Sequence, residues 1–294
     1  MKETITIFTP TYNRKETLSI GYNSLLRQTN KNFIWLIIDD GSTDNTSELV
    51  RTWQNKNNGF EIIYHYKENG GLHTGYNKAI ELIKTELCVC IDSDDYMPNN
   101  AVESILNHWN RYGSNNYAGI IGLDFYTNGK SIGGNLPNVH SLYLMELECK
   151  YHYHGDTKMV LRSDLLKAVA PQPTFENEKN FNPIYLILKI SDLYPFLILN
   201  KNLCYVEYHS EGMSNNIFKQ YKNSPNSFIA LRLLNLTLKR TTITFRFKQH
   251  IHYVSSCILA RRKSIFKDSP NLILTLLALP LGIMLYYYVI WKTK

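Results

Sequence analysis

The first half of the chain alternates short apolar runs with longer segments whose apolar residues recur at helical spacing. The runs predict strands that lie in a parallel sheet, where both faces of a strand are buried. They cover Thr4–Thr9, Phe33–Ile38, Glu61–Tyr66 and Leu87–Ile91. The segments between and after them predict helices at Arg14–Arg27, from about Asn45, at His73–Lys84, and from Pro98 to Trp109. Strands separated by single helices predict an α/β fold with right-handed crossovers.

Beyond Tyr117 the pattern is less regular. Ala118–Asp124 and Lys158–Arg162 have the composition of strands, and a loop rich in Gly and Asn spans Asn128–Asn138. Two later segments, Asn226–Arg240 and Phe245–Lys263, mix aliphatic and basic residues and predict helices. We find no internal repeat.

Length and composition indicate a globular protein. The 294 residues are 44% hydrophobic and 19% charged, enough for one large core or a core with an appendage. The five cysteines include no Cys-x-x-Cys and predict neither a disulfide framework nor a zinc site. Met1 leads straight into a strand pattern without a signal-peptide pattern, so we expect the chain to start in the cytoplasm.

The net charge of +7 is unevenly distributed along the chain. Residues 1–211 carry 19 basic and 24 acidic side chains, whereas residues 212–267 carry eleven basic side chains and no acidic one. A basic region of this kind suits nucleic acid or an anionic membrane surface. The uncharged segment that follows favours the membrane, so we expect no nucleic-acid partner.

The last apolar segment predicts membrane attachment. Leu272–Trp291 contains twenty uncharged residues, a length that as a helix matches a hydrocarbon core of about 30 Å. Pro280 and Gly282 interrupt its centre, and Tyr286–Tyr288 belong to the aromatic class that prefers the membrane interface. These features favour a kinked hairpin or an interfacial helix over a straight span, and a buried core helix is the alternative. Basic residues just upstream would keep the rest of the chain on the cytoplasmic face of the membrane.

Polar loops follow the first four predicted strands. In a parallel sheet the carboxyl ends of the strands face one crevice, so the loops would converge. The first carries an aromatic ring, the second a possible acceptor for a base N–H, the third two adjacent glycines and the fourth three carboxylates in four positions. They are Thr9–Arg14, Asp39–Asp44, Glu68–Gly71 and Asp92–Asp95.

The carboxylates Asp92, Asp94 and Asp95 repel one another unless a cation neutralises them. A hard divalent ion fits oxygen ligands and usually brings phosphates with it. A polar turn before a helix is the alternative for this run alone. Together the four loops predict a nucleotide-diphosphate pocket.

In these motifs the chain resembles the family-2 glycosyltransferases, whose nucleotide-sugar-binding fold is called GT-A. The resemblance rests on Thr9–Arg14, Ile38–Asp44, Asn69–Asn77 and Asp92–Asp95. It covers about the first 125 residues strongly and residues 154–216 weakly. It implies a Rossmann-like, mostly parallel sheet flanked by helices. It also implies an inverting enzyme that uses a nucleotide-sugar together with Mn²⁺ or Mg²⁺, and we expect the donor to be a UDP-sugar. The expected acceptor is a lipid-linked saccharide, as in capsule or exopolysaccharide assembly at the inner face of the membrane.

This resemblance also suggests a division of the chain. Residues 1–215 would form the GT-A catalytic part, with nucleotide-sugar binding in 1–125 and acceptor binding in 126–215. Residues 216–268 would form a basic helical region, and residues 269–294 a membrane-associating tail.

The resemblance implies roles for individual residues. Pro10, Tyr12 and Asp40 would contact the base, and Asp39 or Arg14 would support the loop. Asp92 would lie near the ribose, Asp94 would hold the metal, and Asp95 would orient its neighbours. The remaining residues expected at the donor or the metal are Gly71, Asn77, Ser93 and His209, the last in a late loop over the diphosphate.

Inversion needs a general base for the acceptor hydroxyl, and here the chain departs from the family. The family's acidic motif before a helix corresponds to Phe175–Phe181, and no acidic residue lies near Pro183. Glu178 is the first candidate for the base and Glu176 the second, while surface charges on a loop are the alternative. The family's basic residue after the double glycine is also absent, because Leu72 stands there.

His152-x-His154-x-Asp156 would place three polar groups on one strand face, which favours lining of an acceptor site over a zinc site.

Two rival functions remain open. A sugar nucleotidyltransferase would need a Gly-rich basic loop after the first strand, and Pro10–Tyr12 does not supply it. A catalytically degenerate GT-A protein would bind a sugar nucleotide or a partner without turnover, and the missing carboxylate near Pro183 supports that alternative.

Overall fold

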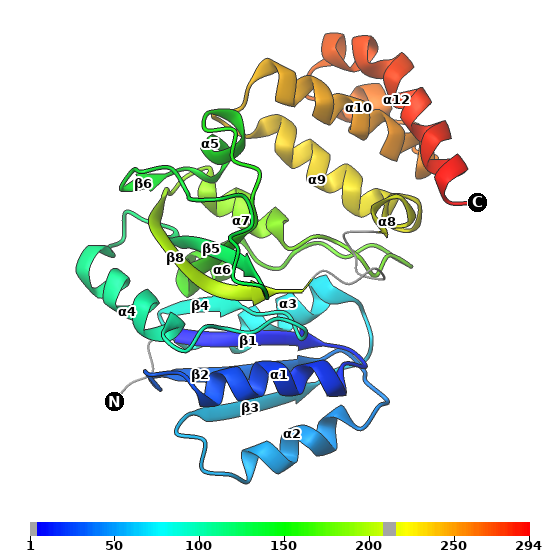
Figure 1. The fold of residues 1–294 in the computed structure, drawn as a ribbon. Coiled ribbons are helices and arrows are strands. Elements are labelled where there is room, and N and C mark those ends of the chain that lie inside the picture. Colours follow the sequence, from blue (N-terminus) through cyan, green and yellow to red (C-terminus); the bar gives the residue numbers. More distant parts are fainter. Residues whose placement is uncertain (1–4, 208–215) are drawn as a thin grey trace.

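A single mixed sheet forms the centre of the computed structural model, which describes residues 5–207 and 216–294 (Figure 1). The order of its eight strands is β3-β2-β1-β4-β7-β5-β8-β6. In chain order the strands are β1 Ile5–Thr11, β2 Phe33–Asp39, β3 Glu61–Tyr66, β4 Leu87–Cys90, β5 Gly119–Tyr126, β6 Ser141–Leu142, β7 Thr157–Arg162 and β8 Phe196–Val206.

The first four strands are parallel, as the sequence predicts. Thr11 at the end of β1 pairs with Asp39 at the end of β2, which in turn pairs with Tyr66 at the end of β3. The loops that follow these strands therefore start from one edge of the sheet. β7 inserts antiparallel between β4 and β5, so the sheet is mixed rather than fully parallel.

Helices cover both faces of the sheet. One face carries α1 (Lys15–Leu26), α2 (Thr46–Gln54) and α4 (Ala101–Tyr112), whose apolar sides pack on β-strand residues such as Trp35. The other face carries α3 (Leu72–Leu82), α5 (Leu144–Cys149), α6 (Ser163–Val169) and α7 (Ile184–Ser191). Burial of both faces explains why the strands read as nearly continuous apolar runs.

The C-terminal helices form a further layer beyond α7, at the end of the molecule far from α2 (Figure 1). They are α8 Ile217–Asn223, α9 Pro225–Thr237, α10 Ile243–Leu259, α11 Ile265–Asp268 and α12 Leu272–Lys292. A small core joins α9 and α10 to the sheet domain, with Leu231 and Phe245 packed in one cluster with Phe181 and Leu188. The basic helical region is therefore packed against the sheet domain and is not tethered by a loose linker.

The apolar C-terminal segment is one helix, α12, which is long and apolar enough to cross a membrane. Thr275, Ala278, Gly282 and Val289 are buried at helical spacing, and this stripe faces α10. A Cβ at Gly282 would lie 2.6 Å from the Cβ of Val254, so glycine permits the close approach. The expected kinked hairpin is thus corrected to a continuous helix, because α10 supports α12 on both sides of Pro280.

Candidate functional site

A cavity of about 560 Å³ opens where the loops after β1, β2, β3 and β4 meet. These four loops are the ones that the sequence predicts to converge. Donor-site residues expected from the sequence that line the cavity are Pro10, Tyr12, Arg14, Asp40, Gly71, Asp92, Ser93 and Asp94. Further lining residues come from later elements and include Asp124, Asp156, Lys158, Lys179 and Glu207.

Side chains of the loops after β1 and β2 tie the two loops together. The backbone N–H of Asn13 donates to Ser42 Oγ at 2.8 Å, and the N–H of Thr43 donates to Asn13 Oδ1 at 2.8 Å. Asn13 adopts a φ of 51°, a left-handed conformation that asparagine tolerates better than most residues. The adjacent Tyr12 is thereby held at the cavity with 49% of its surface exposed. An exposed ring at a fixed position can stack on a flat ligand.

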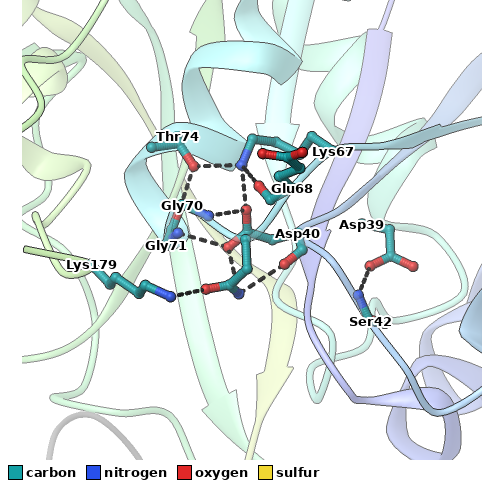
Figure 2. A network of polar contacts seen from close by, with 10 residues as sticks. Asp39, Asp40, Ser42, Lys67, Glu68, Gly70, Gly71, Thr74 and Lys179 are labelled. Atoms are coloured by element: carbon teal, nitrogen blue, oxygen red, sulfur yellow. Dashed lines mark hydrogen bonds and ion pairs between the residues drawn. The ribbon is translucent and has the colours of Figure 1, made fainter. Parts of the chain in front are cut away.

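Asp39 and Asp40 are adjacent but have different surroundings (Figure 2). Asp39 is buried and accepts hydrogen bonds from the N–H of Ser42 at 2.7 Å and from the hydroxyl of Tyr64 at 2.6 Å. It does not line the cavity. Its carboxylate supports the loop after β2. Burial of Tyr64, together with its hydrogen bond to Asp39, raises the pKa of Tyr64.

Asp40 holds the glycine loop in place (Figure 2). Its Oδ1 accepts from Lys67 Nζ and from the N–H of Gly70, and its Oδ2 accepts from the N–H of Gly71 at 2.8 Å and from Asn69 Nδ2 at 3.2 Å. A carboxylate has about four acceptor positions, and these four donors take them all. A base N–H could bind Asp40 only by displacing one of them, so the structure presents Asp40 first as a clamp on the loop after β3.

Gly71 has no room for a side chain. Its φ is +93°, and a Cβ would lie 1.9 Å from the carbonyl oxygen of Lys179. The segment around Lys179 therefore packs directly on the glycine loop, and Lys179 Nζ donates to Asn69 Oδ1 at 2.7 Å. Lys179 lines the cavity and supplies a cation beside Leu72, the position where the family's basic residue is absent.

Lys158 on β7 lies among the carboxylates of the cavity. Its Nζ is 3.6 Å from Asp95 Oδ2 and 3.9 Å from Asp124 Oδ2, and its side chain is only 12% exposed. Burial alone would lower the pKa of Lys158, but the surrounding carboxylates, Asp124 first, raise it well above its ordinary value. Lys158 is therefore a permanent cation that partly neutralises the cluster.

The carboxylates of the cluster remain hard to ionise despite Lys158. Burial raises the pKa of Asp95 to about 7 and that of Asp124 to about 6, and neighbouring aspartates add to both shifts. Asp92 has an exposed surface, but desolvation among the groups of the cavity and the like charge of Asp94 raise its pKa as well. Asp124 Oδ1 is also buried without a hydrogen-bond partner. The site thus holds more negative charge than Lys158 balances.

This charge excess fits a divalent cation. The cavity lining has seven acidic and three basic side chains. Among the described residues, however, no three or more His, Cys, Asp or Glu side chains are arranged to hold an ion by themselves. The lining fits the Mg²⁺ type of site, in which one or two carboxylates act together with the phosphates of a ligand.

The two glutamates expected to supply the general base lie outside the cavity lining. Glu178 is buried and accepts four hydrogen bonds of 2.7–2.8 Å from the backbone and side chains of Asn226 and Ser227, in the first turn of α9. Both of its oxygens therefore cap a helix and neither lines the cavity, a placement that does not favour Glu178 as the general base. Glu176 is exposed and also does not line the cavity.

Other expected residues have different positions from those that the motifs suggest. Asn77 lies outside the cavity lining because its side-chain amide pairs with the backbone N–H and C=O of Gln172, at 2.8 and 2.9 Å. His152 and His154 precede β7 in irregular structure, so the expected strand face is wrong, and of this trio only Asp156 lines the cavity. His209 lies outside the described residues.

The loops that form this cavity lie in a part of the chain that matches a known protein family. The sequence profile described as glycosyl transferase family 2 matches residues 6–169, which include the four strand-end loops and β7. The chain belongs to glycosyl transferase family 2.

The curated relatives of this chain include proteins named as glycosyltransferases and as polysaccharide synthases. Glycosyltransferase GlyG of Streptococcus pneumoniae is 31% identical over 105 residues, which are 36% of this chain and 35% of GlyG. Hyaluronan synthase of Pasteurella multocida is 28% identical over 245 residues, 82% of this chain but 24% of the synthase. The chain thus spans about a third or less of the length of these relatives.

Solved structures share the fold at low sequence identity. TarS 1–349 of S. aureus in complex with UDP-GlcNAc has a TM-score of 0.61 at 17% identity, with 95% of this chain and 80% of that chain covered. The mannosyltransferase PcManGT of Pyrobaculum calidifontis, in complex with GDP-Man and Mn²⁺, has a TM-score of 0.59 at 15% identity, with 100% and 84% covered. The α/β, GT-A-like fold expected from the sequence is confirmed.

Lys158, Asp124 and Glu207 are cavity residues that the sequence motifs do not single out. They come from β7, β5 and the end of β8, beyond the four loops. Lys158 had one available signal, because it is a cation at the start of a strand whose next three residues are apolar.

Proposed function

We propose that this family-2 enzyme transfers a sugar, with inversion, from a nucleotide-sugar to a saccharide acceptor. A UDP-sugar is the proposed donor. The observation that carries the proposal is the cavity in which Tyr12, Asp92 and Asp94, from two different strand ends, meet the glycine loop. The two solved structures named above carry UDP-GlcNAc and GDP-Man, which supports a nucleotide-sugar as the ligand class.

In the proposed complex the nucleoside enters beside the loop after β1. Tyr12 and Pro10 would contact the base, and Asp92 would lie near the ribose. The N–H groups of Gly70 and Gly71 already bind Asp40, so the glycine loop shapes the pocket and does not itself cradle phosphate. Arg14 and Lys179 are the lining cations available for the diphosphate.

Asp94 and Asp92 are the residues proposed to hold Mn²⁺ or Mg²⁺. Asp94 is half-buried and lines the cavity beside Asp92. A bound divalent ion would stabilise the charge that develops on the departing diphosphate. Lys158 forms ion pairs with Asp95 and Asp124, which line the same cavity.

With Glu178 engaged at α9, we propose Asp156 as the general base. It is an exposed carboxylate of the cavity lining and lies on the segment that separates this cavity from a second one, where an acceptor can approach. Asp156→Asn should lower sugar transfer by about 10²–10⁴ while leaving UDP binding intact. A wild-type transfer rate in this variant would exclude Asp156, and the exposed Glu176→Gln serves as the comparison.

Release of UDP from a panel of UDP-sugars, with and without Mn²⁺, tests the proposed reaction. Stabilisation against heat by UDP with Mn²⁺ reports donor binding independently of turnover. Binding without release of UDP, even with saccharide acceptors present, would favour the degenerate binding protein. That second candidate is supported by the helix-capping role of Glu178 and by the lack of a carboxylate near Pro183.

We propose that α12 lies in the membrane interface, with the catalytic part on the cytoplasmic face and a lipid-linked acceptor. Its face opposite α10 exposes large apolar side chains at helical spacing, with 71% of Ile273, 62% of Leu277, 66% of Met284 and 65% of Trp291 exposed. An apolar helix face of this kind binds at the boundary between headgroups and acyl chains.

Membrane attachment can be tested without removing the helix. Leu277→Glu combined with Met284→Glu should abolish pelleting with anionic vesicles, whereas Leu193→Glu, at an apolar position that is 61% exposed elsewhere, should not. Equal pelleting of all three proteins would contradict the proposed orientation of α12.

A further inference from the structure

A second cavity, of about 540 Å³, lies between the sheet domain and the C-terminal helices. Its walls come from α5, α7, α8, α9, α10 and the segment before β7. One part of the wall is apolar and includes Leu144, Leu188, Leu231 and Phe245. The other part is polar and is formed mainly by α9 and α10.

Arg232 of α9 is the central polar group of this cavity. Its guanidinium donates to Gln249 Oε1 at 2.9 Å and to the hydroxyl of Tyr221 at 3.4 Å, whereas its Nε is buried without a hydrogen-bond partner. Within the described parts of the chain, no carboxylate lies at salt-bridge distance from Arg232. Arg232 is half-buried and the charge of Glu148 acts on it only from beyond salt-bridge distance, so an anion in direct contact would complete the site.

Two further basic side chains of α10, Lys248 and His252, line the same cavity. Burial, together with the charges of Arg232 and Lys248, lowers the pKa of His252 to about 4, so His252 is neutral and the positive charge of the cavity comes from Arg232 and Lys248. The one acidic residue of the lining, Glu148 on α5, is exposed. The cavity therefore combines an excess of positive charge with an apolar wall.

We propose that this cavity binds a phosphate group carried on an apolar body, with Arg232 and Lys248 holding the phosphate and the apolar wall holding the body. Arginine and phosphate match in geometry as well as charge, since the planar guanidinium can donate two parallel hydrogen bonds. The arrangement of charged and apolar walls selects an amphiphile over a free anion.

The position of the cavity relates it to the donor site. Tyr153, Gly155 and Thr157 line the second cavity, whereas the alternate residues Asp156 and Lys158 line the donor cavity. One strip of backbone is thus the shared wall. This proposal rests on the proposed function to the extent that the phosphate belongs to the acceptor: a phosphate-linked acceptor held there would place its saccharide toward Asp156.

Binding of decyl phosphate to the full-length protein, kept below the micellar concentration, tests the site directly by calorimetry. Inorganic phosphate and an uncharged decyl glycoside are the two comparison ligands. Decyl phosphate should bind more tightly than either. Arg232→Met and Lys248→Met should each weaken its binding by about tenfold, because each removes a charged hydrogen-bond donor. Lys222→Met, which removes an exposed charge of α8 outside the cavity, should leave it unchanged.

The outcomes separate the parts of the proposal. Equal binding by wild type, Lys248→Met and Lys222→Met would overturn it, because the exposed face of α12 would then account for the binding. Binding of inorganic phosphate as tight as that of decyl phosphate would overturn the apolar part. If Arg232→Met fails to fold, the binding of decyl phosphate to Arg232→Lys and to Lys248→Met, a variant of an exposed residue, still tests the site. Stabilisation of the wild type by UDP with Mn²⁺ is measured in parallel, so failure of the donor site and failure of this cavity are distinguished.

Discussion

Replacement of Glu178 distinguishes a helix cap from a general base. α9 begins with Pro225, which has no N–H, and the next two N–H groups, of Asn226 and Ser227, both donate to Glu178. Their side chains donate to the same carboxylate. Glu178→Ala removes all four bonds and the negative charge at the positive end of the helix dipole.

The expected loss of stability follows from these contacts. Loss of an N-cap acceptor costs about 1 kcal/mol, and loss of the charge at the helix end adds up to about 2 kcal/mol. Ser227 is buried, so its N–H and hydroxyl cannot form hydrogen bonds with water when Glu178 is removed. These unsatisfied donors lower the free energy of unfolding further. We expect a total of about 3 kcal/mol, which corresponds to a fall in Tm of about 6–12 °C. Glu178→Gln should lose a similar amount, because its NH₂ group meets donors.

Thermal unfolding and UDP release, measured on the same samples below the transition, check this prediction. Glu176→Gln is the matched control, since Glu176 is an exposed neighbour without a described bond to α9. The capping role predicts a lower Tm for the Glu178 variants and little change for the control. A Glu178→Gln protein with wild-type Tm and a rate lowered by about 10²–10⁴ would refute the reasoning and return the base to Glu178.

Three further predictions concern the donor cavity. Asp94→Ala should leave Tm unchanged but remove the Mn²⁺ dependence of UDP binding, which calorimetry with and without the ion measures. Burial raises the pKa of Asp124 to about 6, so the stability that the protonated carboxyl contributes is full below about pH 4 and is lost as the pH rises through about 6. In denaturant unfolding, Asp124→Asn should therefore remove this contribution to the pH dependence of the free energy of unfolding between pH 4 and 7. Gly71→Ala should weaken UDP binding and lower Tm, because the new methyl group would overlap the carbonyl of Lys179; unchanged binding would contradict the packing described here.

The donor cavity could be predicted from sequence because its parts share one simple geometric rule. Tyr12, Asp40, Gly71 and Asp94 follow consecutive parallel strands, and the carboxyl ends of such strands lie at one edge. Apolar runs locate the strands, and the register then brings the loops together. The profile of the family agrees with this part of the chain, residues 6–169.

The parts that could not be predicted depend on contacts between distant segments. β7 inserts antiparallel between β4 and β5, so the position of Lys158 beside Asp95 follows from strand order and not from local pattern. Similarly, Asn77 belongs to a matching motif, but its amide is used by Gln172, 95 residues away in sequence. A motif identifies the residue types, whereas the tertiary contacts decide which of them face the ligand.

Leu72 shows how one contact of this kind changes an interpretation. From the sequence, the family's basic residue after the double glycine is absent, because Leu72 stands at that position. In the structure Lys179 reaches the same loop from a segment more than a hundred residues later and bonds to Asn69. The positive charge is thus present, but it is supplied by a different element.

Glu178 and Lys179 are adjacent, and together they join the two halves of the molecule. Glu178 fixes the first turn of α9, while Lys179 bonds to the glycine loop at the donor cavity. α9 packs on α10, and α10 carries α12 with its exposed apolar face. Because one dipeptide bonds to both sides, the orientation of the donor cavity relative to α12 is fixed by short contacts and not by a linker. A membrane surface bound by α12 would therefore hold the donor cavity at a defined height and angle, which is what an enzyme acting on a lipid-linked saccharide requires.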